Sequence, residues 1–213
     1  MSPPRRPKRE NPMTKPEGKP MNAAPDSPPI LLRPARPDDA LCLSVLAMQV
    51  FLDTYATEGI RPSLAREVLS SYSAVAFSTA LEDGRVRLWV AERLGHLVGF
   101  AQITLGERHA LAPPGVQAEL LRLYVQEPFT GQHIGSRLLA AAETLAAQHG
   151  ATVLWLTPWV HNQRARAFYQ ALGYQDFGLT SFVFEGECHD NRLVAKLLSP
   201  GSAAAAGPDA LRP

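Results

Sequence analysis

LLRLYVQEPFTGQHIGSRLLAAAETLAAQHG, residues 120–150, is the stretch that decides the fold. Apolar residues recur at every second position in its first part, on one predicted face of a strand: Leu121, Leu123 and Val125. Pro128 ends the strand, and a turn with two glycines follows. From Ile134 the apolar residues recur at helical spacing until Gly150, which is placed to end a helix. The stretch therefore predicts a strand, a turn and a helix in direct succession.

The start of this predicted helix suits a phosphate. A helix that directly follows a strand presents backbone N–H groups without intrahelical partners, together with the positive end of the helix dipole. The turn from Thr130 to Gly135 is too poor in glycine for a dinucleotide-binding fingerprint, and it lacks the Gly-Lys-Ser/Thr of a P-loop. Helix starts after strands are common, so the turn alone leaves two readings open, an ordinary helix start and a site for a phosphorylated cofactor.

Length and charge indicate one folded domain with tails. The chain has 213 residues, 46% of them hydrophobic, and a formal net charge of +1. Residues 1–29 hold nine prolines and six Lys/Arg against three acidic residues, which predicts a disordered, basic, proline-rich tail. A basic arm for a nucleic acid or an acidic partner is the alternative for this tail. The remainder carries a net charge of −2, which argues against a nucleic-acid-binding body.

Cysteine usage and hydropathy argue for a cytoplasmic protein. The two cysteines, Cys42 and Cys188, are far apart and lack the spacing of a metal site or a disulfide framework. No run approaches the ~20 apolar residues that a membrane span needs. The basic N-terminus has no apolar core behind it, so we do not expect a secretory signal.

The rest of the chain mixes strand and helix patterns. Strands are predicted at residues 30–33, 86–90, 97–105, 121–125, 153–156, 182–185 and 192–198, with a hairpin turn at Leu94-Gly95-His96. Helices are predicted after Asp38 or Asp39, from Ser63, from Ile134 and after Asn162. Residues 73–81 are ambiguous between helix and loop, and residues 106–118 read as a loop. The crossover rule places 153–156 parallel to 121–125, which predicts an α/β body over residues 30–199 and a disordered tail at 200–213.

A second motif, HNQRARAFYQALGY at residues 161–174, follows the predicted strand 153–156. Together with 120–150 at this separation, it resembles the GCN5-related N-acetyltransferase (GNAT) superfamily over about residues 30–198. The resemblance implies a mixed, mostly antiparallel central sheet with a splayed parallel βαβ unit, flanked by helices. The segments FLDTY (51–55), WLTPWVHN (155–162), and GLTSF (178–182) together with residues 190–197, are further similar to bacterial spermidine/spermine N-acetyltransferases of the Pai type.

The resemblance implies acetyl-CoA as the cosubstrate and direct transfer of its acetyl group to a primary amine. The residues it assigns to the cofactor are Leu123, Tyr124, Val125, Thr130, Gly131, Gln132, His133, Ile134, Gly135, Ser136, Arg137, Asn162 and Phe168. Backbone groups of Leu123 and Val125 would hold the pantetheine arm, and the N–H groups of 132–137 the pyrophosphate. The family pattern is Gln/Arg-x-x-Gly-x-Gly/Ala; Thr130 replaces the Gln or Arg and His133 replaces a Gly, departures that bear on cofactor affinity.

Two residues are candidates for the chemistry. An amine with a solution pKa near ~10 must lose a proton before it attacks a thioester, and Glu119, at the head of the central strand, is the candidate base. Tyr169 lies where the family places the phenol that protonates the departing thiolate. The alternatives are a solvated strand-end carboxylate for Glu119 and a core aromatic for Tyr169.

The acceptor amine stays open among polyamine, aminoglycoside, amino acid and protein or peptide amine. Asp53, Glu58 and Glu82 are the carboxylates expected for a polyamine pocket. A different class of function, a non-catalytic acyl-CoA-binding module that regulates a partner, is the alternative to an enzyme. A homodimer is open as well. His109, His149 and the Cys188-His189-Asp190 cluster match no standard metal spacing, so we expect no metal.

Overall fold

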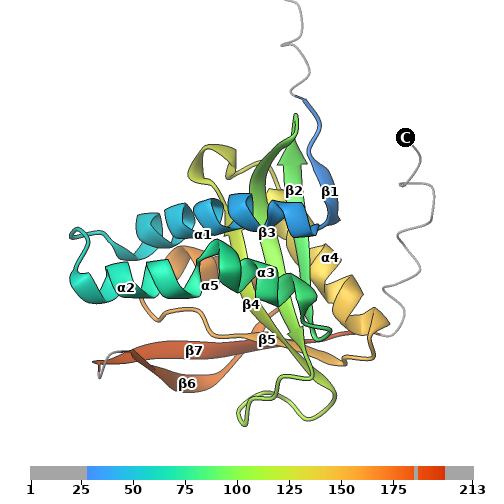
Figure 1. Cartoon of the computed structure of the whole chain (residues 1–213). Coiled ribbons are helices and arrows are strands. Elements are labelled where there is room, and N and C mark those ends of the chain that lie inside the picture. The colour runs from blue at the N-terminus through green and yellow to red at the C-terminus, as the bar shows by residue number, and fades with distance from the viewer. Residues whose placement is uncertain (1–27, 185–186, 200–213) are drawn as a thin grey trace, which may run out of the picture.

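The computed structural model describes residues 28–184 and 187–199; the predicted tails, residues 1–27 and 200–213, lie outside this part. One seven-stranded sheet runs in the order β1-β2-β3-β4-β5-β7-β6, with helices on both faces (Figure 1). The strands are β1 (Leu31–Pro34), β2 (Val86–Arg93), β3 (His96–Leu105), β4 (Gln117–Val125), β5 (Val153–Leu156), β6 (Gln175–Phe184) and β7 (Glu187–Leu197). The helices are α1 (Ala40–Tyr55), α2 (Pro62–Ser71), α3 (Ala74–Glu82), α4 (Ile134–Gln148) and α5 (Gln163–Ala171), with the short 3-10 helices η1 (Pro37–Asp39) and η2 (Glu127–Phe129).

All neighbouring strands are antiparallel except β4 and β5, which confirms the mixed sheet with one parallel βαβ unit. This parallel pairing covers only Gln117–Val153 to Glu119–Trp155, and beyond it the two strands separate. The predicted parallel orientation of these two strands is confirmed, and their pairing lies at residues 117–119, before the predicted strand 121–125 begins. β4 begins at Gln117, four residues before the predicted start, so the last residues of the segment predicted as the loop 106–118 belong to this strand.

A β-bulge interrupts β4. Gln102 of β3 pairs with Arg122 while Ile103 pairs with Leu120, so Leu121 is an extra residue without a partner. Leu121 is 43% exposed, and the prediction that it shares a face with Leu123 was wrong. After the bulge, Leu123 and Val125 face the same side as the buried Leu120.

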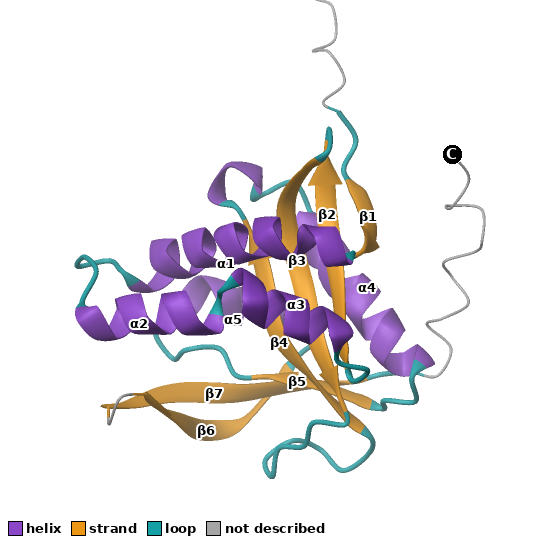
Figure 2. Ribbon diagram, in the orientation of Figure 1, coloured by secondary structure: helices purple, strands orange, loops and turns teal. Residues whose placement is uncertain are grey.

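Helices cover both faces of the sheet (Figures 1 and 2), and a separate core lies on each face. On one face α4 packs against the sheet through a cluster that includes Val98, Ala101, Leu120, Leu138, Leu139 and Ala142. On the other face α1 and α3 pack through a cluster that includes Leu43, Leu46, Phe77, Leu88, Val90 and Phe100. Burying each large apolar side chain contributes about 1.5–3 kcal/mol, so both clusters hold β3 and β4 firmly between helix layers.

Several boundaries differ from the sequence prediction. Residues 73–81, left ambiguous, form α3, whose first turn is capped by Ser73: its hydroxyl accepts from the Ala76 N–H at 3.2 Å. The last two strands begin at Gln175 and Glu187, well before the predicted 182 and 192. A bulge near Gly178 and many polar residues hide the strand pattern there, because β6 lies at the edge of the sheet. Residue 185 of the predicted strand lies outside the described part.

Candidate active site

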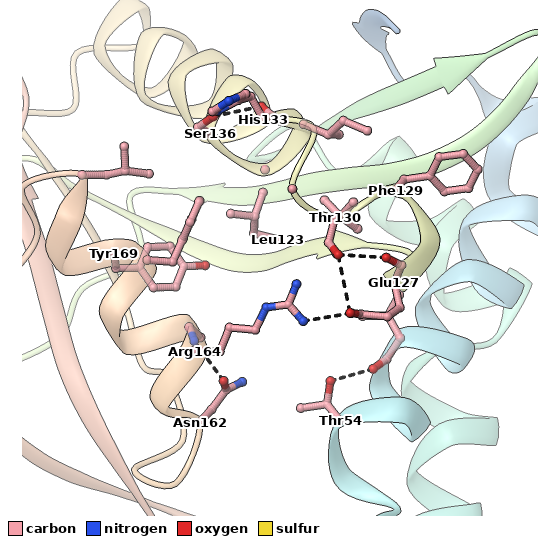
Figure 3. A pocket seen from close by; sticks show the side chains of 18 of the residues that line it. Thr54, Leu123, Glu127, Phe129, Thr130, His133, Ser136, Asn162, Arg164 and Tyr169 are labelled. Atoms are coloured by element: carbon pink, nitrogen blue, oxygen red, sulfur yellow. Dashed lines mark hydrogen bonds and ion pairs between the residues drawn. The ribbon is translucent and has the colours of Figure 1, made fainter. Parts of the chain in front are cut away.

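A cavity of about 930 Å³ opens where β4 and β5 separate. Four parts of the chain form its walls: the end of α1, the second half of β4, the turn that leads into α4, and α5 (Figure 3). The lining residues that were predicted for the cofactor or the chemistry are Leu123, Val125, Thr130, Gly131, His133, Ile134, Gly135, Ser136, Asn162, Phe168 and Tyr169. Residues that are more than 40 positions apart in the sequence therefore line the same cavity.

The turn before α4 exposes backbone donors to this cavity. His133, the N-cap of α4, has a φ of 59° in the left-handed region, and no side chain caps the helix. The first N–H that bonds back is that of Arg137, to the His133 carbonyl at 3.1 Å. Within the described part of the chain, the N–H groups of Gly135 and Ser136 have no acceptor. Free N–H groups at the start of a 15-residue helix fit a phosphate or pyrophosphate.

The Thr130 side chain stabilises the same turn through a hydrogen bond. Its hydroxyl donates to the Glu127 carbonyl at 2.8 Å, which closes η2. The Glu127 carboxylate accepts from Arg164 of α5 at 2.9 Å, so an ion pair joins two walls of the cavity (Figure 3). Both side chains are 68% exposed, and such a pair contributes only about 0–1 kcal/mol to stability.

Arg164 lines the cavity although the sequence interpretation did not single it out. It is the second residue of α5. A cation in the first turn of a helix opposes the helix dipole, and this was the available signal that the position serves something other than helix stability.

The backbone of β4 has one free edge at the cavity. The Gln126 N–H donates to the Val98 carbonyl at 3.0 Å, so the even-numbered residues here point their backbone groups at β3. Those of Leu123 and Val125 consequently point away from β3, toward the side from which β5 has separated. Such an edge can pair with the amide groups of an extended ligand.

Tyr169 is a buried phenol whose hydroxyl has no partner in the described part of the chain. It is 6% exposed and packs edge-on against Phe168 and Tyr174, with ring centroids 5.2 and 5.5 Å away. Burial, with a further contribution from Tyr55, raises the pKa of the Tyr169 hydroxyl, so this group stays protonated at neutral pH. Figure 3 shows the phenol pointing into the cavity. Buried hydroxyls without a partner are rare, which suggests that a ligand completes the site.

Asn162 and Phe168 shape the opposite wall. The Asn162 side-chain oxygen accepts from the Ala165 N–H at 3.0 Å and so caps α5, the ordinary alternative to orienting a cofactor. The Phe168 ring lies 3.5 Å from the position that a Cβ on Gly135 would take, so it packs on the first turn of α4.

Four predicted residues do not line the cavity. The side chain of Gln132 donates to the Pro128 carbonyl at 3.5 Å, and Arg137 donates to the Ile30 carbonyl at 3.0 Å. Glu119 and Tyr124 lie on the other face of β4, because Leu120, Leu123 and Val125 occupy the cavity side.

The environment of Glu119 raises its pKa to about 7. The main cause is loss of solvent on burial, followed by repulsion from Glu107; the positive charge of Arg122 acts in the opposite direction. A carboxyl group that titrates near neutrality can accept a proton from an amine or a water molecule. Glu119 lies on the face of β4 opposite to the face from which Leu123 and Val125 line the cavity.

The carboxylates expected for a polyamine do not converge. Asp53 lines the cavity, and Glu58 lies exposed in the turn after α1. Glu82 ends α3, next to the N-terminal end of α1 and therefore far from Asp53 (Figure 1).

The histidines considered for a metal have other partners. His109 packs against Trp155 and lies within 3.3 Å of the Thr180 hydroxyl, and His149 contacts the Leu145 carbonyl. The described residues contain no group of three His, Cys, Asp or Glu side chains that is arranged for a metal. They also contain no helix that is long and apolar enough to cross a membrane.

Comparison with known proteins gives a consistent result. Residues 52–174 match the sequence profile of the Acetyltransferase (GNAT) family. The chain is 29% identical over 138 residues to an uncharacterized N-acetyltransferase of Mycobacterium bovis, which covers 62% of this chain and 83% of the relative. It is 36% identical over 99 residues to the aminoalkylphosphonate N-acetyltransferase of Salmonella typhimurium, covering 46% and 63% of the two chains. The solved PaiA N-acetyltransferase of Thermoplasma acidophilum, in complex with coenzyme A, has the same fold, with a TM-score of 0.64, 21% identity and coverage of 79% and 99%.

Proposed function

Because the chain belongs to the Acetyltransferase (GNAT) family and is an acetyl-CoA-dependent N-acetyltransferase, we propose that it transfers the acetyl group directly to the primary amine of a small molecule. Acetyl-CoA supplies the acetyl group as an activated thioester. The observation that carries the proposal is the buried Tyr169 hydroxyl, which has no protein partner and lines the same cavity as the free N–H groups of α4.

Different residues around the cavity would bind different parts of acetyl-CoA. The N–H groups at the start of α4 would hold the pyrophosphate, with Gly131 and Gly135 keeping the approach free of side chains. The free edge of β4 at Leu123 and Val125 would pair with the pantetheine arm. Arg164 would lie beside the cofactor while its ion pair with Glu127 links the two walls. These contacts position the thioester before any proton moves.

Two groups would move the protons. Glu119, with a pKa of about 7, is half ionised near neutral pH and would take the proton of the ammonium, directly or through water. Tyr169, with its raised pKa, would donate its proton to the leaving thiolate. They lie on opposite sides of β4, so the amine would approach from the α1 side and the cofactor from the α4 side.

A panel of amines tests the proposal and the acceptor class. Release of free CoA is measured with a thiol reagent for polyamines, aminoglycosides, amino acids and the N-terminal amine of a peptide. A polyamine is the acceptor that the Pai-type resemblance suggests, but of the three carboxylates expected for it only Asp53 lines the cavity. The small-molecule reading predicts turnover with at least one small amine and much slower turnover with the peptide.

Calorimetry with acetyl-CoA separates the enzyme from the alternative, a regulatory acyl-CoA-binding module. Binding without turnover on any amine would favour the regulatory module, for which a thiolate acid at Tyr169 has no use. No binding at millimolar acetyl-CoA would refute both readings.

A further inference from the structure

Arg122 is the side chain on the acceptor side of β4 that the proposed chemistry does not use. The bulge at Leu121 places Glu119, Arg122 and Tyr124 on the same face, toward α1, α2 and α3. The Arg122 guanidinium lies over the ring of Tyr72, 4.8 Å from its centroid.

Neutral groups fix the orientation of this guanidinium. One of its NH₂ groups donates to the side-chain oxygen of Gln102 at 2.7 Å. The other makes a long contact of 3.5 Å to the Ser71 carbonyl. Gln102 is itself buried, so it holds a defined position on β3. An arginine has five N–H donors, and several of these are left for another acceptor.

Arg122 forms no ion pair. Among residues 28–181 and 190–199, no carboxylate lies within ion-pair distance of its half-buried side chain; Glu119, on the same face of β4, is the acidic group whose pKa its charge acts to lower. Arg33, also half-buried, shows the usual arrangement, with both Asp39 and Glu92 at 2.7 Å. A partly desolvated cation held by neutral groups and an aromatic face is a ready site for an anion.

The position of Arg122 relative to Glu119 limits the size of such a ligand. Glu119 pairs with Thr104 of β3, and Arg122 pairs with Gln102. Thr104 and Gln102 are two residues apart on β3, so Glu119 and Arg122 are separated by the length of two strand residues. This corresponds to roughly 7 Å between backbones. An amine beside the base and an anionic group beside the guanidinium would then be separated by only a few bonds.

We propose that Arg122 selects an acceptor amine that carries an anionic group, a carboxylate or a phosphonate, a few atoms from the reacting nitrogen. The inference rests on the proposed function and names its substrate class. A polycation such as a polyamine would meet the fixed positive charge of Arg122 and would be disfavoured.

Matched acceptors test this selectivity. β-Alanine and 2-aminoethylphosphonate are compared with 3-aminopropanol and ethanolamine, which present an amine without the anion, and with spermidine. We expect the wild-type protein to prefer one or both anionic acceptors by kcat/KM, and the comparison between them identifies the anion. Arg122→Gln should lower kcat/KM for the preferred anionic acceptor by on the order of 10- to 100-fold, since a hydrogen bond to a charged group is lost. Because the Arg122 charge also acts to lower the pKa of Glu119, both acceptors are compared at a pH where the rate of each variant has reached its plateau. There the neutral acceptor should stay within about threefold, and Arg122→Lys should restore part of the preference.

Arg87→Gln is the control variant. Arg87 is also half-buried, but its guanidinium donates to the backbone carbonyls of Gly84 and Val86. This variant should keep the wild-type ratio of anionic to neutral turnover.

The inference would be overturned by a wild-type enzyme that acetylates neutral amines or spermidine as well as the anionic ones. It would also be overturned if Arg122→Gln slowed both acceptor types equally, which would mean a structural role for Arg122. Absence of CoA release with every amine would instead count against the acetyltransferase function.

Discussion

Replacing Tyr169 with Phe separates chemistry from stability. The hydroxyl of Tyr169 donates to no group in the described chain, and the ring contacts with Phe168 and Tyr174 would remain in the variant. We therefore expect the free energy of unfolding to change by less than about 1 kcal/mol. A general acid contributes about 10²–10⁴-fold, so kcat should fall at least ~100-fold, which corresponds to about 2.7 kcal/mol in the barrier.

Tyr174→Phe is the control, for which we expect the opposite result: a loss of stability without a loss of kcat. Tyr174 is 4% exposed, and its hydroxyl donates to Glu143 at 3.1 Å. Loss of this bond leaves the carboxylate with Lys196 at 2.9 Å, so we expect a cost of about 1–2 kcal/mol in stability and an unchanged kcat.

Both variants are measured by CoA release at saturating acetyl-CoA and amine, and by denaturant unfolding. A Tyr169→Phe enzyme that turns over as fast as the wild type would refute the assignment of Tyr169 as the acid. A large loss of stability in the same variant would show that its hydroxyl has a structural partner.

Four further substitutions test other parts of the molecule. Wild-type kcat/KM should rise with pH up to a plateau above about 7, and Glu119→Gln should remove this limb and lower the rate by roughly 10- to 100-fold. Because folding raises the pKa of Glu119 from 4.5 to about 7, wild-type stability should fall as pH rises across this interval, and Glu119→Gln should abolish that contribution to the fall in unfolding experiments. Gly99→Ala should cost about 1–3 kcal/mol in denaturant unfolding, since its Cβ would lie 2.8 Å from the Tyr124 carbonyl, whereas Gly135→Ala has room and should be neutral or slightly stabilising. Asn162→Ala should lower the free energy of unfolding by about 1 kcal/mol through loss of the α5 cap; no loss would show that the cap is dispensable.

Much of the fold was accessible from the sequence because its signals are local. The helix from Ile134 to Gln148 follows from apolar spacing, and Gly150 past its end has a φ of 84°, as a residue ending a helix often does. The turn between β2 and β3 likewise appears as predicted, with positive φ at Leu94 and Gly95.

The features that the sequence did not predict depend on partners distant along the chain. The bulge at Leu121 exists only relative to β3, and it changes which residues of β4 face each helix layer. The ion pair between Glu127 and Arg164 likewise forms only when α5 folds back to the turn before α4. Periodicity within one segment cannot report such pairings.

The candidate site shows the same division. The turn before α4 could be located from its glycines and its place after a strand. His133, which replaces a Gly of the family pattern, adopts a left-handed φ there. The unpaired charge of Arg122 could not be read from the sequence, because it depends on which carboxylates other strands and helices bring near.

The early separation of β4 from β5 has a consequence for amide hydrogen exchange. In the middle of a sheet most backbone amides exchange with solvent slowly, because their neighbours protect them. The amides of Leu123 and Val125 lie in the centre of the sheet order, but their N–H groups point away from β3 and β5 no longer lies beside them, so they should exchange fast in the free protein. A ligand that pairs with this interior edge would slow them selectively, so that exchange at these two positions reports occupancy of the cleft independently of turnover.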